Sequence, residues 1–382
     1  MNSLAQLELV AACAMGLEAL VARELKELGY TDQTVENGKV VFRGDELAIA
    51  RTNLWLRTAD RVLIRMGQFR AVTFDELFEG TKAFAWHEWI PEDAAFPVEG
   101  RSHKSQLSSV PACQGIVKKA VVDSMKRHYG GGDWFAETGP RYTIEVSLLN
   151  DIATLTLDTT GLSLHKRGYR KLVTEAPLKE TLAAALVQLS RWQPHRPLYD
   201  PFCGSGTIPI EAALIGWNIA PGLRRTFASE AWDRLPEELW DQAREEAYDA
   251  VRDDVPLDIA GSDVDRAAVD VAEAAAKAAG LARELRFRVS DIAAAQPRGD
   301  YGALITNPPY GERLGDQSEA EHALRELGRL YDRLPTWSAF VISPARQLEH
   351  YMGRRSDKNR KLFNGRIETH FHQFFGPLPP RK

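Results

Sequence analysis

Hydrophobic positions near the start of the chain follow two periodicities. Between residues 15 and 29 apolar side chains recur at helical spacing: Leu17, Leu20, Val21, Leu25 and Leu28. Gly29 follows as a C-cap. The segments LELVAACA, VVFRG and RVLIRMGQF instead have short, strand-like apolar patterns. The pattern predicts a small α+β unit.

A second α+β pattern follows between residues 74 and 158. The segments FDELFEGTKAF and PACQGIVKKAVVDSMKRHYG are predicted as helices, AFPVEGRS as a strand, and YTIEVSLLNDIATLTLD as a hairpin turning at Asn150 and Asp151. The apolar stripe of the long helix leaves Lys118 and Lys119 toward solvent. A solubilising face explains these lysines on its own, and contact with nucleic-acid phosphates is the alternative.

A connector, GLSLHKRGYRKLVTEAPLKE, separates this half from the next. It places Lys166, Arg167 and Arg170 around the aromatic Tyr169. Basic residues beside an aromatic ring suit phosphate contact combined with base stacking, although a linker can carry such a cluster by chance.

The C-terminal half changes character. After the helical segment KETLAAALVQLSRW, the run PLYDPFCGSGTIPIEAALIG predicts a short strand, a Gly-rich turn and a new helix. That order is typical of the first turn of a doubly wound α/β domain, where ligands bind beyond the carboxyl ends of the strands. The turn has only the G-x-G of Gly204 and Gly206, so a nicotinamide or flavin cofactor is not favoured.

Composition and charge narrow the class of protein. The chain has 382 residues, 44% of them hydrophobic, and a net charge of -5. The charge is uneven: local sums are +4 over residues 96–171, +6 over 346–382 and -8 over 230–258. The two basic regions keep a nucleic-acid partner open, and the acidic run is interpreted as a solvated helix face. The three cysteines stand too far apart in the sequence to suggest a disulfide framework or a metal site, and no metal is implied. Because the sequence shows no signal peptide and no membrane span, a cytoplasmic location is expected.

Acidic residues stand at the ends of three predicted strands. Asp200 precedes the Gly-rich turn, Asp263 ends the strand in LDIAGSD, and Asp291 ends LRFRVSD. Each alone has helix N-capping as the simpler explanation. Together they describe an adenosine with a cationic, amino-acid-like tail, because carboxylates bind ribose hydroxyls, an adenine amino group and an ammonium group, and would repel a pyrophosphate.

A fourth strand, YGALIT, ends in NPPY, residues Asn307, Pro308, Pro309 and Tyr310. A turn containing proline is the simpler interpretation. The alternative is a site for an exocyclic amino group, a poor nucleophile whose lone pair is delocalised into its ring. If the Asn307 side-chain oxygen and the Pro308 carbonyl accept its two N–H bonds, the nitrogen can pyramidalise. Tyr310 then offers a ring on which an extruded base stacks.

The motifs DPFCGSGT and NPPY, preceded by HKRGYR and APLKETLAAAL, resemble those of the THUMP-domain class I RNA methyltransferases, in particular the bacterial ribosomal-RNA guanine-N2 methyltransferases. NIAPGLRRTFASEAW and KNRKLFNGRIE are also similar to family segments, so the likeness covers nearly the whole chain. The resemblance implies an α/β protein with an N-terminal α+β ferredoxin-like and THUMP module and a C-terminal Rossmann-like, doubly wound methyltransferase domain. The implied divisions are 1–60 ferredoxin-like, 61–160 THUMP, 161–175 linker and 176–382 methyltransferase.

The resemblance also implies S-adenosylmethionine as cofactor and RNA as partner, with Asn307 to Tyr310 as the catalytic residues. The cofactor candidates are Thr181, Asp200, Phe202, Gly204, Ser205, Gly206, Thr207, Asp263, Asp291 and Asn307. The RNA candidates are Lys118, Lys119, Lys166, Arg167, Arg170, Arg360 and Lys361. Large-subunit ribosomal RNA is the expected substrate. Transfer RNA, a DNA amino-methyltransferase and a non-catalytic RNA-binding or assembly factor remain as alternatives.

Overall fold

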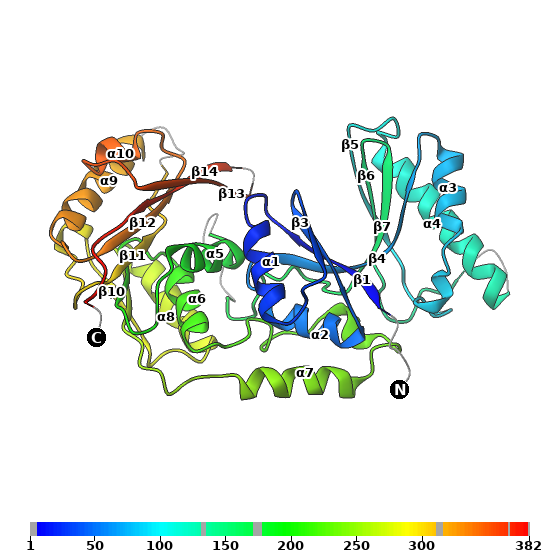
Figure 1. Cartoon of the computed structure of the whole chain (residues 1–382), viewed down its shortest axis with the longest axis horizontal. Helices are drawn as coiled ribbons and strands as arrows, with labels where there is room; N and C mark the ends of the chain where they lie inside the picture. Colours follow the sequence, from blue (N-terminus) through cyan, green and yellow to red (C-terminus); the bar gives the residue numbers. More distant parts are fainter. Residues whose placement is uncertain (1–5, 131–134, 171–177, 311–315, 366, 381–382) are drawn as a thin grey trace.

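Two β-sheets organise the protein (Figure 1). The computed structural model describes residues 6–130, 135–170, 178–310, 316–365 and 367–380. Within these ranges the strands form two seven-stranded sheets, one in the N-terminal half and one in the C-terminal half. None of the helices in these ranges offers an apolar stretch of the length that a bilayer crossing requires.

The N-terminal sheet has the strand order β2-β3-β1-β4-β7-β6-β5. Its strands are β1 Leu7–Cys13, β2 Gln33–Glu36, β3 Lys39–Gly44, β4 Ala59–Arg70, β5 Val98–His103, β6 Ile144–Leu149 and β7 Ile152–Asp158. All neighbours are antiparallel except β5 and β6. The 12-residue strand β4 pairs with β1 on one side and β7 on the other, so the expected division at residues 60 and 61 falls inside a strand that both units share.

Four helices accompany this sheet: α1 Glu18–Glu27, α2 Glu46–Trp55, α3 Phe74–Lys82 and α4 Val110–Tyr129, with the 3-10 turn η1 Trp86–Glu88. Two local signals are confirmed. Gly29 follows α1 with φ +93°, and its N–H donates to the Lys26 carbonyl. Asn150 and Asp151 join β6 to β7 with φ of +50° and +64°, the left-handed pair that a tight hairpin requires.

The C-terminal sheet has the order β10-β9-β8-β11-β12-β14-β13. Its strands are β8 Leu198–Asp200, β9 Ile259–Asp263, β10 Leu285–Val289, β11 Ala303–Thr306, β12 Ser338–Ser343, β13 Lys358–Asn364 and β14 Ile367–Phe374. β14 runs antiparallel to both its neighbours, and the other pairs are parallel. The chain moves outward from β8 in one direction through β9 and in the other through β11, which places the switch point of a doubly wound sheet between β8 and β11.

Helices cover both faces of this sheet. The C-terminal helices are α5 Glu180–Ser190, α6 Thr207–Gly216, α7 Glu237–Asp249, α8 Arg266–Ala278, α9 Asp316–Asp332 and α10 Leu348–Tyr351, with the turns η2 Ala228–Ala231 and η3 Ile292–Ala294. Residues of α5, α6 and α8 share one apolar cluster, and residues of α9, α10 and η3 share another. The expected doubly wound domain is therefore confirmed.

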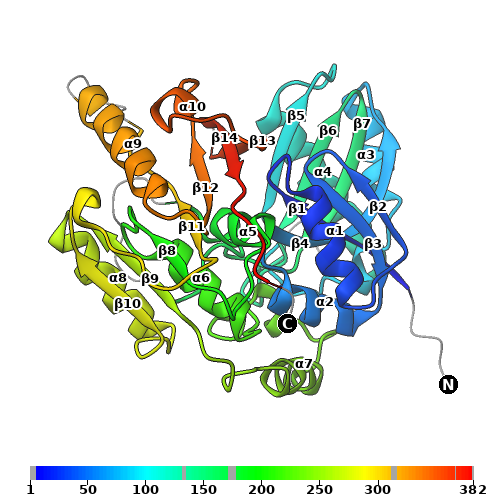
Figure 2. The same ribbon diagram turned by 60° about the vertical axis from the view of Figure 1, so that its left-hand side comes forward.

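The acidic segment between α6 and β9 has the expected solvated face, with Glu237, Glu238, Asp241, Glu245 and Asp249 of α7 exposed, but the opposite face of this helix is buried. Trp240, Ala243 and Ala247 of α7 are buried in the same apolar cluster as the N-terminal module. α7 lies along the lower edge of the molecule beneath α2 (Figures 1 and 2), and Arg51 of α2 donates to Glu246 at 2.6 Å. We call residues 217–250 the strap, because this part of the catalytic domain reaches back and packs on the other half.

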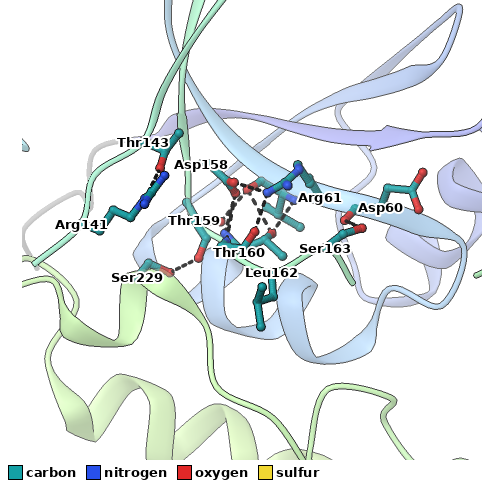
Figure 3. A network of polar contacts seen from close by, with 12 residues as sticks. Asp60, Arg61, Arg141, Thr143, Asp158, Thr159, Thr160, Leu162, Ser163 and Ser229 are labelled. Atoms are coloured by element: carbon teal, nitrogen blue, oxygen red, sulfur yellow. Dashed lines mark hydrogen bonds and ion pairs between the residues drawn. The ribbon is translucent and has the colours of Figure 1, made fainter. Parts of the chain in front are cut away.

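The strap also closes over the end of β7 (Figure 3). Asp158 accepts hydrogen bonds from Arg61 and from the Thr160 N–H, and the Ser229 hydroxyl donates to the Thr159 carbonyl at 2.8 Å. The hydrogen bond from Ser229 to Thr159 crosses the junction and helps to fix how the strap meets the N-terminal module, while Arg61 and Thr160 satisfy Asp158 within that module.

Candidate active site

A cavity of about 560 Å³ opens at the carboxyl ends of β8, β9, β10 and β11, beside the switch point. Nine of the residues expected at the site line it: Asp200, Phe202, Gly204, Ser205, Thr207, Asp263, Asp291, Asn307 and Pro309. They come from four separate strand ends, which the parallel topology brings to one edge of the sheet.

Asp200 is the most deeply buried of the three carboxylates. It is 1% exposed, and its Oδ1 accepts from the Thr306 hydroxyl at 2.6 Å and from the Phe202 N–H at 3.1 Å. Burial raises the pKa of Asp200 to about 7, against the lowering effect of these two hydrogen bonds, and the charge on Asp263 raises it further. A cation brought into the cavity would favour the ionised form of Asp200.

The two glycines of the turn have different roles. Gly206 has φ +75°, and a Cβ there would lie 2.9 Å from both the Ala272 Cβ and the Phe287 ring, so this glycine is required for packing. Gly204 has φ +51° with nothing within 4 Å of a notional Cβ, and its N–H donates to Asp263 Oδ2 at 2.9 Å. Backbone at Gly204 is therefore open to close approach by a ligand.

Asp263 and Asp291 border the same cavity. Asp263 does not cap α8, since Asp265 is the N-cap, but its two oxygens accept from the N–H groups of Gly204 and Asp265. Asp291 does cap η3, because its Oδ1 accepts from the Ala293 N–H at 2.8 Å. Asp291 therefore does both: it caps η3, as the simpler explanation expects, and it lines the cavity.

The NPPY segment, Asn307 to Tyr310, directly follows the end of β11. Asn307 and Pro309 line the cavity, Pro308 is buried, and the Tyr310 hydroxyl donates to Asn307 Oδ1. The oxygen expected to accept from a target amino group therefore already accepts from a neighbouring side chain. The Asn307 oxygen has a second lone pair, so a substrate amino group can share this acceptor with Tyr310 or displace the hydroxyl.

Thr181 is a correction to the expected cofactor set. It is 3% exposed, does not line the cavity, and donates instead to Asp60 Oδ1 at 3.2 Å. Its helix, α5, packs between the two halves, so Thr181 joins the catalytic domain to the start of β4.

Arg167 is a correction to the expected RNA-binding set. Its side chain is 2% exposed, and its Nε lies 3.4 Å from Glu211 Oε1. It also donates to the carbonyls of Leu164 and Arg57. All of these partners are internal, so the Arg167 guanidinium is not available to a phosphate.

The other residues expected to contact RNA fall into two groups, those with largely buried or paired side chains and those with exposed side chains. Arg170 is largely buried against Glu180 and Thr207, and Lys118 donates to Glu137 at 2.5 Å and to the Phe96 carbonyl. The exposed candidates are Lys119, Lys166, Arg360 and Lys361. Lys361 forms a 2.5 Å ion pair with Glu368 on the surface. Lys171, which the connector also contains, lies outside the described residues.

Several cavity residues were not anticipated. Val264 and Ile292 each directly follow a strand-end acid and add apolar surface to the wall, and Glu319 and His322 reach it from α9. The sequence could have predicted Val264 and Ile292, because each is an apolar residue directly after a strand-end acid. No comparable signal pointed to α9, whose approach depends on tertiary packing. Across the described ranges, no three His, Cys, Asp or Glu side chains gather as a metal ion would need.

The comparisons with known proteins agree with this architecture. Residues 167–373 match the methyltransferase domain described as RMKL-like, residues 8–63 match the RlmL ferredoxin-like domain, and residues 71–158 match the THUMP domain. The chain is 50% identical over 375 residues to the Bacillus subtilis (strain 168) protein named "Putative RNA methyltransferase YpsC", covering 98% of this chain and 97% of that protein.

Two solved structures are similar over the full length. One, from Listeria monocytogenes str. 4b F2365, is described as a predicted N6-adenine-specific DNA methylase; it is 52% identical, with a TM-score of 0.93 and coverage of 98% of this chain and 97% of that one. The other, SMU.472 complexed with SAH, is 44% identical, with a TM-score of 0.93 and coverage of 98% and 99%. The chain therefore belongs to the RMKL-like methyltransferases, the THUMP-domain class I RNA methyltransferases that its motifs resemble.

Proposed function

We propose that this enzyme transfers a methyl group from S-adenosylmethionine to the exocyclic N2 of a guanine in RNA, with large-subunit ribosomal RNA as the substrate. The observation that carries the proposal is the arrangement of NPPY. Asn307 and Pro309 share one cavity with the three strand-end carboxylates, so an amino group held at Asn307 lies beside the ligand that the carboxylates select. The 44% identical SMU.472, complexed with SAH, supports the identity of that ligand.

The residues of the cavity fit S-adenosylmethionine. Its cationic amino-acid end suits the buried Asp200 and the open backbone at Gly204. Asp263 suits the ribose hydroxyls and Asp291 the adenine amino group, while Val264 and Ile292 supply apolar surface for the adenine ring. We propose Phe202, Ser205 and Thr207 as further contacts, since all three line the cavity.

The chain's contribution to the reaction is positioning. The bound cofactor would supply a methyl group on a sulfonium, which an in-line nucleophile takes up while the sulfur leaves as a neutral thioether. Asn307 Oδ1 and the Pro308 carbonyl accept the two N–H bonds of the guanine amino group, and this holds the nitrogen lone pair in the attacking direction. The Tyr310 hydroxyl leaves Asn307 when the amino group arrives, and its ring becomes available for stacking. The amino proton passes to water after transfer, so no strong base is needed.

RNA as the substrate is supported by the THUMP domain over residues 71–158 and by the name of YpsC, "Putative RNA methyltransferase". We propose the exposed Lys119, Lys166, Arg360 and Lys361 as phosphate contacts. Transfer RNA is the second candidate substrate. The Listeria relative is described as acting on DNA adenine, so base and nucleic acid both need a direct test.

Product analysis tests the function. Purified protein is incubated with isotopically labelled S-adenosylmethionine and, separately, with ribosomal RNA, transfer RNA and DNA from a strain lacking the gene. After digestion to nucleosides, mass spectrometry is expected to find label in N2-methylguanosine from ribosomal RNA. Label in N6-methyladenosine would contradict the assigned base, and label confined to transfer RNA would contradict the assigned substrate.

Cofactor binding is expected to depend on pH through Asp200. A cationic ligand prefers the ionised carboxylate, and the pKa of Asp200 in the free protein is about 7. Below that pH the affinity for S-adenosylhomocysteine should fall by up to about tenfold per pH unit, with proton release on binding. Calorimetry between about pH 5.5 and 7.5 in buffers of different ionisation enthalpy measures both quantities.

Asp200→Asn provides the control for this pH dependence, because it retains the shape of the side chain and removes the titration. Its affinity should be weak at every pH and its pH profile flat. The linkage to stability has the sign of a raised carboxyl pKa: the ligand-free protein should lose stability as pH rises from the range of an unfolded Asp toward 7. A wild-type affinity that does not change with pH would contradict the assignment of Asp200 to the cationic end.

A further inference from the structure

A second pocket borders NPPY next to the cofactor cavity. It has a volume of about 410 Å³ and is bounded by Tyr310, by α9 and by the segment that leads from β12 into α10. Pro309 lines both pockets and thus forms part of the wall between them. α9 contributes to both as well, with His322 facing the cofactor cavity and Glu321 facing the second pocket.

The side chains of this pocket have the chemistry of a nucleotide site. Tyr310 and Tyr351 supply aromatic rings, and Arg346 supplies an exposed guanidinium, which has Glu368 as an electrostatic neighbour. Glu321 supplies a carboxylate that is 33% exposed. Stacking rings, a cation and one acceptor together are what a base with its phosphate requires.

We propose that this second pocket selects guanine over adenine, with Glu321 accepting the N1–H of the base and Arg346 contacting its phosphate. The inference rests on the proposed function, since it concerns the base presented to Asn307. Guanine carries a donor at N1, next to the N2 amino group, whereas adenine carries an acceptor at N1 that a carboxylate repels. Asn307 and Pro308 read only an amino group, which both bases possess, so discrimination needs a further residue.

Glu321 has a competing explanation as a surface ion pair. Its Oε2 lies 3.4 Å from Arg325 Nη2 at the i,i+4 spacing of a helix, and Arg325 also lies over the Tyr351 ring at 5.2 Å. An exposed pair of this length contributes little to stability. If Glu321 served only in this ion pair, replacing it would not change which nucleotide binds. Nucleotide preference therefore distinguishes the ion pair from a role in base selection.

Nucleotide binding tests the pocket without requiring the natural RNA. Protein saturated with S-adenosylhomocysteine is titrated with GMP, IMP and AMP, and binding is followed by saturation-transfer NMR. GMP is expected to bind about tenfold or more tightly than AMP, and IMP, which keeps the N1–H but lacks the amino group that Asn307 and Pro308 read, should bind more weakly than GMP. Glu321→Ala should remove that difference by weakening GMP and IMP. Glu321→Gln, which can also donate to the N1 of adenine, should bring AMP close to GMP.

Two further variants locate the contacts. Arg346→Ala should weaken GMP and AMP alike and leave the nucleoside guanosine unaffected, because only the phosphate contact is lost. Glu273→Gln, an equivalent change at an exposed position on α8, should leave every affinity unchanged.

An unchanged preference for GMP in Glu321→Ala would overturn the inference, as would the absence of GMP binding at concentrations up to roughly 10 mM. These outcomes are independent of the proposed function, which is judged by the methylated nucleoside. N2-methylguanosine as the product together with an unchanged preference would reject the pocket alone. N6-methyladenosine as the product would reject the proposed function.

Discussion

Asn307→Ala is expected to lower the rate of methyl transfer by roughly 30- to 1000-fold while leaving cofactor and RNA affinity nearly unchanged. The Asn307 oxygen accepts from an amino group whose N–H bonds become more acidic as positive charge develops on nitrogen, so the interaction strengthens toward the transition state. Removing one such group costs about 2 to 4 kcal/mol of transition-state stabilisation. Single-turnover transfer at saturating protein measures the effect.

Tyr310→Phe is the matched control for this prediction. It removes the hydroxyl that donates to Asn307 Oδ1 in the structure but keeps the ring. Its transfer rate should remain close to that of the wild type, because the hydroxyl leaves before reaction. If Asn307 only shaped a turn, Asn307→Ala would lower the melting temperature, and its folded fraction would transfer methyl at the normal rate.

Arg167→Ala is expected to destabilise the protein by about 3 kcal/mol or more without changing RNA affinity per folded molecule. Arg167 and Glu211 are both buried, and removing the cation leaves the Glu211 carboxylate with the Tyr169 hydroxyl as its recorded hydrogen-bond donor among the described residues. Arg57 is a second cation near Glu211, so the substitution leaves this buried carboxylate only partly compensated, which is still costly. Chemical denaturation, with filter binding of RNA to the folded fraction, measures the two quantities separately.

Lys166→Ala is the neighbouring control, since Lys166 is exposed in the same segment. It should leave stability unchanged and weaken RNA binding modestly, more at low salt than at high salt. A stable Arg167→Ala variant with greatly reduced RNA affinity would contradict the structural role and return Arg167 to the RNA surface.

Local signals were sufficient for much of the fold. The hairpin at Asn150 and Asp151 and the C-cap at Gly29 depend on residues that are neighbours in sequence, so both could be predicted. The strand-end positions of Asp263 and Asp291 were predictable for a related reason: once the strands are assigned, the parallel order brings their carboxyl ends to one edge.

Burial caused by distant partners could not be predicted. Helix α2 lacks a one-sided apolar stripe because it is covered on more than one side, with Ala48, Asn53 and Leu54 all buried and α7 packed against it. Arg167 has the same sequence signature as its exposed neighbour Lys166, and the two are distinguished by tertiary partners of Arg167 such as Glu211 on α6. The periodicity of apolar residues predicts which face of a helix or strand packs on the core, but it does not predict that a second face will be covered by another element.

The strap has a consequence for folding during synthesis. The N-terminal module leaves the ribosome first, but the apolar side chains of Trp232, Trp240 and Ala247 that complete its core are made much later. Roughly 190 residues separate α2 from the end of α7, which is about 10 to 40 s of bacterial translation. During that interval the face of α2 that α7 will cover is exposed to solvent and to chaperones, so the N-terminal module reaches its final stability only after the catalytic domain has been made as far as the end of α7.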